Sequence, residues 1–261
     1  DSWSGISATG TKYTFSPAGT GTGYIVGTSG SLTDSTGLVT VTTGGLASIV
    51  IRTEADGAGQ AFDQNTTVQA GDALTLYAAG YDDEGFFISD VTALWSIDGP
   101  DIGDFVNADS ATSNTINLTT VGSARLKIDK ADGSYIDYSG IIQVVAGPAD
   151  SMAYVFGADT LVGPAGSTIS DPLEVKVFDA FMNPVDSIWV YWETTPYGAT
   201  LGSSFNNDSS LTDVRGQAES KWTLRTQVGL DTAYASVPGV DTLDFIAKVQ
   251  ESTADRMFRV S

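Results

Sequence analysis

Residues 122–147 read GSARLKIDKADGSYIDYSGIIQVVAG, and residues 19–44 read GTGTGYIVGTSGSLTDSTGLVTVTTG. The two stretches align without a gap at an offset of 103 residues. Each ends in a short, largely apolar run, IIQV or LVTV, that leads to a glycine. Recurrence at this distance indicates a structural repeat of about a hundred residues. The identical pairs include Gly19 and Gly122, Ile25 and Ile128, Asp34 and Asp137, Gly37 and Gly140, Val41 and Val144, and Gly44 and Gly147.

A second pattern also occurs twice, and it joins an Asp that follows an aromatic residue to a later Trp. Asp82 and Trp95 lie 13 residues apart, and so do Asp179 and Trp192. Both Trp residues lie in short runs rich in β-branched and aromatic residues, so each pattern predicts two strands joined by a turn. Because they recur in phase, Trp95 and Trp192 are predicted to pack in a core rather than to bind sugars.

Trp189 lies three residues before Trp192 and is expected to point to the opposite side of the same strand. An exposed indole ring beside Tyr191 or Tyr197 is a candidate for contact with a ligand such as a glycan.

The two patterns divide the chain into units. Residues 1–46 are predicted to be the C-terminal part of one domain, 47–147 and 148–251 two full domains, and 252–261 the first strand of a further domain. A chain that starts and stops inside a repeat is expected to belong to a longer array. The linkers Gly44-Gly45 and Gly147-Pro148 are short, which predicts a semi-rigid series of domains rather than a flexible string.

The interrupted ends allow two interpretations. The rest of a longer protein supplies the missing strands of residues 1–46, or residues 252–261 of one copy complete that unit in another copy by strand addition. The first is favoured, because one strand does not replace two missing strands.

Composition narrows the function. The 261 residues include no Cys and no His, and the formal net charge is −20. Thiol chemistry and histidine-based catalysis or metal binding are thereby excluded, and the acidity argues against nucleic-acid partners. No apolar stretch approaches the roughly 18 residues that a membrane span requires. Short β-prone runs between Gly, Asp, Asn and Ser clusters predict an all-β fold of antiparallel sandwiches.

Part of the chain resembles a known family. Residues 172–185, PLEVKVFDAFMNPV, and residues 212–218, TDVRGQA, followed by WTL at 222–224, are similar to invasin/intimin-type bacterial immunoglobulin-like domains. Met182 stands where that family usually has Gly. Residues 1–147 resemble related immunoglobulin-like repeats of large surface proteins. The resemblance implies tandem immunoglobulin-like β-sandwiches, and an immunoglobulin-type sandwich has about seven strands in about 100 residues.

The resemblance also implies an extracellular protein at the cell surface. We expect a non-catalytic structural segment of an S-layer, sheath or filament protein, which assembles with copies of itself. Two alternatives are the stalk of an adhesin and an accessory module of a secreted polysaccharide-degrading enzyme. Glycans are a further candidate partner.

Calcium is the candidate ligand, because extracellular modules bind it through carboxylates and carbonyls in loops. One candidate loop, residues 98–104, contains three acids, and another turn begins with Asp82. Neither has the spacing of an EF-hand loop, and Asp is common in turns for other reasons. The candidate residues are Asp98, Asp101 and Asp104 in the first loop, and Asp82, Asp83 and Asp90, with Glu84, in and near the second.

Overall fold

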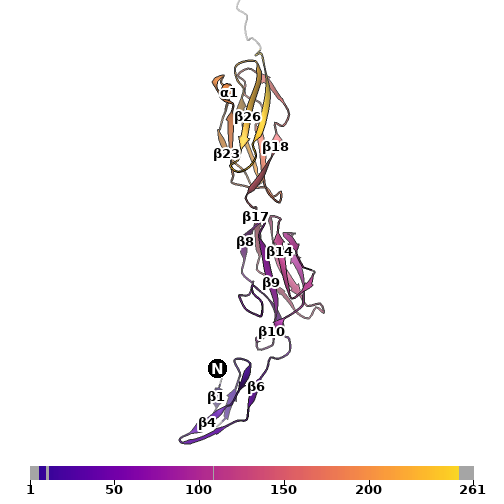
Figure 1. The fold of residues 1–261 in the computed structure, drawn as a ribbon, viewed down its shortest axis with the longest axis vertical. Helices are drawn as coiled ribbons and strands as arrows, with labels where there is room; N and C mark the ends of the chain where they lie inside the picture. Colours follow the sequence, from indigo (N-terminus) through magenta and orange to yellow (C-terminus); the bar gives the residue numbers. More distant parts are fainter. Residues whose placement is uncertain (1–5, 10–11, 108, 253–261) are drawn as a thin grey trace, which may run out of the picture. The chain divides into compact units, whose positions relative to one another are not determined.

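The computed structural model describes residues 6–9, 12–107 and 109–252, and it is almost entirely β-structure. Its one helix, α1, covers Pro196–Thr200. The chain forms two compact units, each visible in Figure 1. The N-terminal unit comprises Asp1–Val68, Asp72–Leu118 and Gly122–Gln143, and the C-terminal unit comprises Gln69–Gly71, Thr119–Val121 and Val144–Ser261.

The C-terminal unit contains a β-sandwich, which we call the second complete repeat. One sheet has the order β18-β20-β24 and the other β19-β27-β26-β21-β23, and β22 and β25 pair separately. The pairing of β19 with β27 is parallel, an exception to the antiparallel arrangement expected from the sequence. The strands are β18 (Ala149–Phe156), β19 (Leu161–Pro164), β20 (Leu173–Asp179), β21 (Trp189–Thr194), β22 (Ser204–Phe205), β23 (Ser209–Leu211), β24 (Gln217–Ser220), β25 (Trp222–Thr223), β26 (Gly229–Ser236) and β27 (Leu243–Gln250).

Strands β7 to β17 form the first complete repeat, with a similar strand order. One sheet has the order β10-β9-β14-β12, with β7 paired to β9, and the other has the order β13-β11-β15-β17-β8, with β16 paired to β15. The strands are β7 (Ser48–Arg52), β8 (Thr66–Gln69), β9 (Ala73–Tyr81), β10 (Phe87–Asp90), β11 (Ala93–Asp98), β12 (Gly103–Phe105), β13 (Ser110–Ala111), β14 (Ser113–Leu118), β15 (Gly122–Asp129), β16 (Ile136–Tyr138) and β17 (Ile142–Val145).

The strands that precede the first complete repeat follow the predicted repetition in part. They pair as β1 with β2, β3 with β6, and β4 with β5. The β3–β6 pair corresponds, at the offset found in the sequence, to β15 and β17. The strands are β1 (Ile6–Thr9), β2 (Lys12–Phe15), β3 (Gly21–Gly23), β4 (Val26–Ser29), β5 (Leu32–Ser35) and β6 (Val39–Val41).

Alternation along the strands builds the core. In β20, Leu173, Val175 and Val177 are fully buried, whereas Glu174 and Lys176 between them are only half-buried. Burial of each such side chain stabilises the fold by about 1.5–3 kcal/mol.

The structure places the two recurring tryptophans, Trp95 and Trp192, where the sequence predicts them. Trp95 is 3% exposed and Trp192 is 2% exposed, and each indole N–H has a partner, the carbonyl of Ala111 or the hydroxyl of Ser210. The prediction that these two side chains are core residues is confirmed.

The domain boundaries given above remain predictions. Residues 253–261, most of the predicted first strand of a further domain, lie outside the described residues.

Candidate functional site

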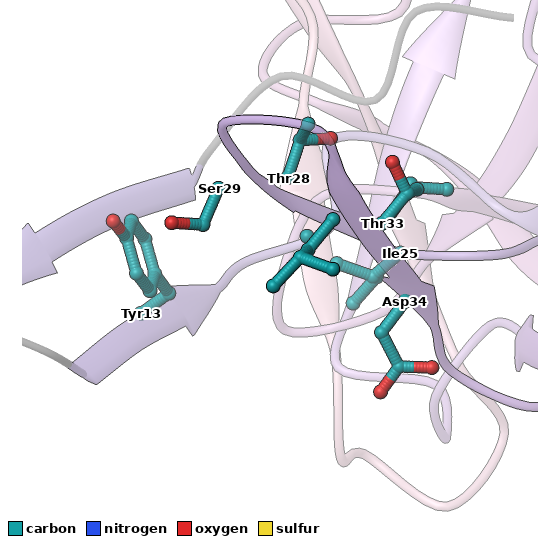
Figure 2. A pocket seen from close by; sticks show the side chains of 9 residues that line it. Tyr13, Ile25, Thr28, Ser29, Thr33 and Asp34 are labelled. Carbon is teal, nitrogen blue, oxygen red and sulfur yellow. The ribbon is translucent and has the colours of Figure 1, made fainter.

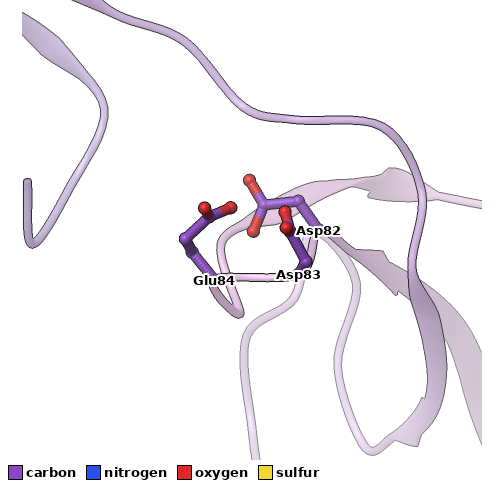
Figure 3. Close-up of side chains that lie close together, drawn as sticks. All are labelled: Asp82, Asp83 and Glu84. Carbon is purple, nitrogen blue, oxygen red and sulfur yellow. The ribbon is translucent and has the colours of Figure 1, made fainter.

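The turn that follows β9 brings three carboxylates together. Asp82, Asp83 and Glu84 each place a carboxylate oxygen within 4.8 Å of the others, and Figure 3 shows the three side chains at the turn. Asp82 is buried, and the other two are exposed. Within residues 13–107 and 109–252, this is the one group of three acidic side chains so placed.

Backbone hydrogen bonds hold Asp82 in place. Its Oδ1 accepts from the backbone N–H of Phe86 at 2.7 Å, and its Oδ2 accepts from that of Gly44 at 2.9 Å. The turn closes because Asp82 N–H donates to the Phe86 carbonyl and Gly85 N–H donates to the Asp82 carbonyl. Asp82 therefore ties the segment before β7 to the end of β9.

The pKa values of two of these acids shift in opposite directions. Burial acts to raise the pKa of Asp82, but the backbone hydrogen bonds, led by those of Gly44 and Phe86, outweigh it and lower that pKa. A side-chain hydrogen bond with Asp83, together with some burial and the neighbouring negative charges, raises the pKa of Glu84. The turn therefore combines a carboxyl group whose pKa is lowered, Asp82, with one whose pKa is raised, Glu84.

The second complete repeat builds the same turn at the end of β20. Asp179 Oδ1 accepts from Asn183 N–H at 2.9 Å, and its Oδ2 accepts from Gly147 N–H at 2.9 Å. Met182 occupies the position of Gly85 and likewise donates its N–H to the Asp carbonyl. We call the two segments, 82–86 and 179–183, the aspartate turns.

The two aspartate turns differ in what lies against the carboxylate. In the second turn, the Asn183 side-chain amide donates to Asp179 Oδ2 at 2.9 Å and to the Thr119 carbonyl at 2.8 Å. Ala180 and Phe181 stand where the first turn has Asp83 and Glu84. A neutral amide donor thus stabilises the carboxylate of Asp179 by a hydrogen bond, whereas the first turn adds negative charge beside Asp82.

The other acids proposed from the sequence do not join this group. Asp98 pairs with Arg125 at 2.8 Å, and Asp101 accepts from Gly103 N–H at 3.0 Å. Asp104 is exposed, and Asp90 accepts from the Asp56 N–H at 3.0 Å. The sequence did not identify the role of Gly44 and Gly147 as donors to the buried aspartates, although their alignment at the 103-residue offset marked both positions.

A hollow of about 650 Å³ lies among the early strands. Figure 2 shows Tyr13, from β2, and Thr33 and Asp34, from β5, among the side chains that line it. Tyr13 and Leu32 at its wall are more than two-thirds exposed. Residues 252–261, the strand that could complete residues 1–46 by strand addition, lie outside the described residues except for residue 252.

Trp189 is the third feature singled out by the sequence. Its side chain is 50% exposed, and that of Tyr191 is 41% exposed, so both point away from the core side of β21 that holds Trp192. The prediction that Trp189 faces the other side of its strand from Trp192 is confirmed. Tyr197, in α1, is exposed as well and contacts Arg225 through its ring.

No helix in residues 13–107 or 109–252 is long and apolar enough to cross a membrane. No protein-family model and no curated protein matches the chain.

Solved structures do match. An Escherichia coli adhesin, FdeC, is 19% identical with a TM-score of 0.47, and the match covers 82% of this chain and 68% of that one. The Yersinia pseudotuberculosis adhesin InvE is 15% identical with a TM-score of 0.32, over 71% of this chain and 56% of that one. Domains 4–9 of the surface layer protein SbsC are 18% identical with a TM-score of 0.30, over 91% of this chain and 36% of that one. Bacterial adhesins, the class that the sequence of residues 148–251 resembles, are thus among the similar structures, and the assignment of an immunoglobulin-like sandwich rests on the strand order described above.

Proposed function

We propose that the chain is a non-catalytic structural segment of a large extracellular surface protein, of the S-layer, sheath or filament kind, which assembles with neighbouring copies of itself. The observation that carries the proposal is a hydrogen bond between a buried aspartate and a glycine that occurs in both complete repeats. In both complete repeats a buried aspartate ties the glycine before the first strand to the end of the second strand of its sheet. A hydrogen bond that holds the start of each domain to its sheet suits a protein that bears mechanical load along a series of domains.

Composition supports the same proposal. A net charge of −20 keeps a β-rich repetitive protein soluble and suits a medium rich in salt or calcium. The exposed acids also provide attachment points for cations between copies.

The stalk of an adhesin is the second candidate, and the sequence resemblance of residues 148–251 favours it. An adhesin stalk projects a binding tip and does not assemble into a lattice. An accessory module of a secreted polysaccharide-degrading enzyme is the third, and a catalytic domain in the same protein would mark it.

Electron microscopy of the purified protein, with millimolar calcium and then with a chelator, tests the proposal. The structural role predicts an ordered lattice or filament. Dispersed single particles in both conditions contradict assembly and favour the adhesin stalk. An array that dissolves only on chelation would also support calcium as the bridging ion.

A further inference from the structure

We propose that the outer face of the β19-β27-β26-β21-β23 sheet binds a neutral or amino-sugar polysaccharide, with sugar rings stacked on Trp189 and Tyr191. The face is defined by Trp189, Tyr191 and Glu193 of β21, Tyr234 of β26 and Asp244 of β27, and we call it the aromatic face. The inference goes beyond the structural role proposed above and does not depend on it.

The two rings are placed side by side by the strand itself. Trp189 and Tyr191 alternate with the fully buried Val190 and Trp192 of β21, so both project from the outer side of the sheet. Residues two apart on a strand lie roughly 6–7 Å apart. Two half-exposed rings at this spacing place adjacent apolar surfaces in contact with solvent, and we call them the platform.

Polar groups lie next to the platform in register. Glu193 is the partner of Tyr234 across the β21–β26 pair, and Tyr234 is the partner of Asp244 across the β26–β27 pair. Residues directly opposite in an antiparallel pair share one face of the sheet. The carboxylates of Glu193 and Asp244 therefore flank the Tyr234 ring, and both residues are exposed.

Serine hydroxyls complete the surroundings of the second ring. Tyr191 is paired with Ser209 of β23 on one side and with Ser236 of β26 on the other. Tyr191 and Tyr234 are thus flanked by residues that accept or donate hydrogen bonds, whereas Trp189 is paired with the exposed Leu211 of β23.

The first complete repeat shows that the fold does not require these aromatics. When the buried Trp95 is superposed in sequence on Trp192, Thr92, Leu94 and Ser96 take the places of Trp189, Tyr191 and Glu193. By the pairing of β11 with β15, Lys127 takes the place of Tyr234. Lys127 forms an ion pair with Asp129 at 3.0 Å. The first complete repeat therefore has no ring at the places of Trp189, Tyr191 and Tyr234, although Tyr138 of β16 lies beside Lys127.

The mixture of rings and acids identifies the class of ligand. The centre of a protein–protein interface is depleted of charged residues, whereas Glu193 and Asp244 stand among the rings of the aromatic face. A sugar unit has an apolar C–H surface that packs on an aromatic ring and a rim of hydroxyls that donate to carboxylates. At the aromatic face, Glu193 and Asp244 disfavour acidic polysaccharides and direct contact with the acidic surface of a second copy of this chain.

Tryptophan fluorescence provides a local readout. Of the four tryptophans in residues 13–107 and 109–252, Trp95, Trp192 and Trp222 are buried, and Trp189 alone is half exposed. We would titrate the chain with laminarin, hydroxyethylcellulose, mannan and chitohexaose, with heparin as the acidic probe and hexa-arginine as the basic peptide probe. Binding on the aromatic face predicts a blue shift or a change in intensity with at least one neutral or amino-sugar probe.

Affinity electrophoresis or calorimetry with the probe that binds then compares variants. Trp189→Ala and Tyr191→Ala are expected to weaken binding at least tenfold each. Tyr24→Ala, which removes an exposed aromatic ring from the N-terminal unit, is the matched control and is expected to leave binding unchanged. Far-ultraviolet circular dichroism checks that each variant is folded.

Three results would overturn the inference. The first is no response to any neutral or amino-sugar probe. The second is binding that survives the double substitution of Trp189 and Tyr191. The third is a response to hexa-arginine alone, which would assign the face to a basic protein partner instead.

Discussion

The carboxylate of Asp179 accepts a hydrogen bond from the backbone N–H of Gly147 at 2.9 Å, and so ties the entry of β18 to the end of β20. The same relationship joins Asp82 and Gly44, also at 2.9 Å. Both aspartates are at most 3% exposed. A buried carboxylate is tolerated only when hydrogen bonds satisfy its oxygens, and in both repeats the backbone of the entering segment supplies one of them.

Substitution of Asp179 is predicted to destabilise the second complete repeat. Asp179→Ala removes a charged acceptor and leaves the N–H groups of Gly147, Phe181 and Asn183 without their hydrogen-bond partner. The free energy of unfolding should fall by about 2–4 kcal/mol. Urea unfolding followed by fluorescence measures the change. Asp186→Asn, at an exposed position, is the control. An Asp179→Ala protein as stable as the wild type would show that the tie contributes nothing.

Stability is predicted to fall in acid because of these same carboxylates. Burial acts to raise the pKa of Asp179, but hydrogen bonds, the largest from the Asn183 side chain, outweigh it and lower that pKa. A carboxyl group with a lowered folded-state pKa contributes stability above its unfolded pKa of about 3.9, and this is lost as the pH falls through the folded-state value. Thermal unfolding from pH 6 to pH 2 should therefore show a steep loss below about pH 4. The loss should be shallower in Asp179→Asn, and an unchanged slope in that variant would contradict the assignment.

Met182 is predicted to carry backbone strain. Its φ is +65°, in the left-handed region, where the family that the sequence resembles usually has Gly. A non-glycine residue in that region costs about 1–2 kcal/mol, and Met182 is 65% exposed, so little packing is lost on its removal. Met182→Gly should therefore raise the free energy of unfolding by about 0.5–1 kcal/mol after the entropy cost of Gly is subtracted.

Gly85 provides the reciprocal test in the first aspartate turn. Its φ is +84°, and a Cβ added there would meet no atom within 4 Å. Gly85→Ala should thus destabilise the first complete repeat by about 1 kcal/mol through the backbone alone. Denaturant titration of both variants measures the two effects, and a destabilising Met182→Gly would refute the strain.

Calcium binding remains a prediction, and the structure sharpens its location. Asp82, Asp83 and Glu84 come together, whereas Asp101 and Asp104 do not join a group of three within residues 13–107 and 109–252. Calorimetry should detect binding with a dissociation constant on the order of 10⁻⁴–10⁻³ M. The heat should disappear in the Asp83→Asn/Glu84→Gln double variant and persist in Asp101→Asn/Asp104→Asn. The opposite pattern would place the site in residues 98–104, and the absence of heat in the wild type would exclude both.

Much of the fold is predictable from the sequence, because alternation and turn chemistry act locally. The 103-residue offset correctly related β3 and β6 to β15 and β17, and the phase of Trp95 and Trp192 correctly placed both in the core. The parallel pairing of β19 with β27 was not predicted, because the sequence of a four-residue strand does not indicate whether its partner runs parallel or antiparallel to it.

The candidate sites were predictable only in part. In the sequence, the acids of residues 98–104 are as suitable for calcium binding as those of 82–84. In the structure, however, Asp98 forms an ion pair with Arg125, 27 residues later in the chain. Such a pairing depends on the register of β11 and β15. The other residues of the aromatic face could not be predicted for the same reason. Tyr234 and Asp244 lie on the same face as Glu193 because of the register in which β21, β26 and β27 pair.

The central claim is that the chain serves outside the cell as part of a surface structure. Immunogold electron microscopy of intact cells, with antibodies raised against the purified chain, tests it most directly. The account predicts dense, regularly spaced label on the outer surface of unpermeabilised cells. Label that appears only after permeabilisation, inside the cell, would contradict it.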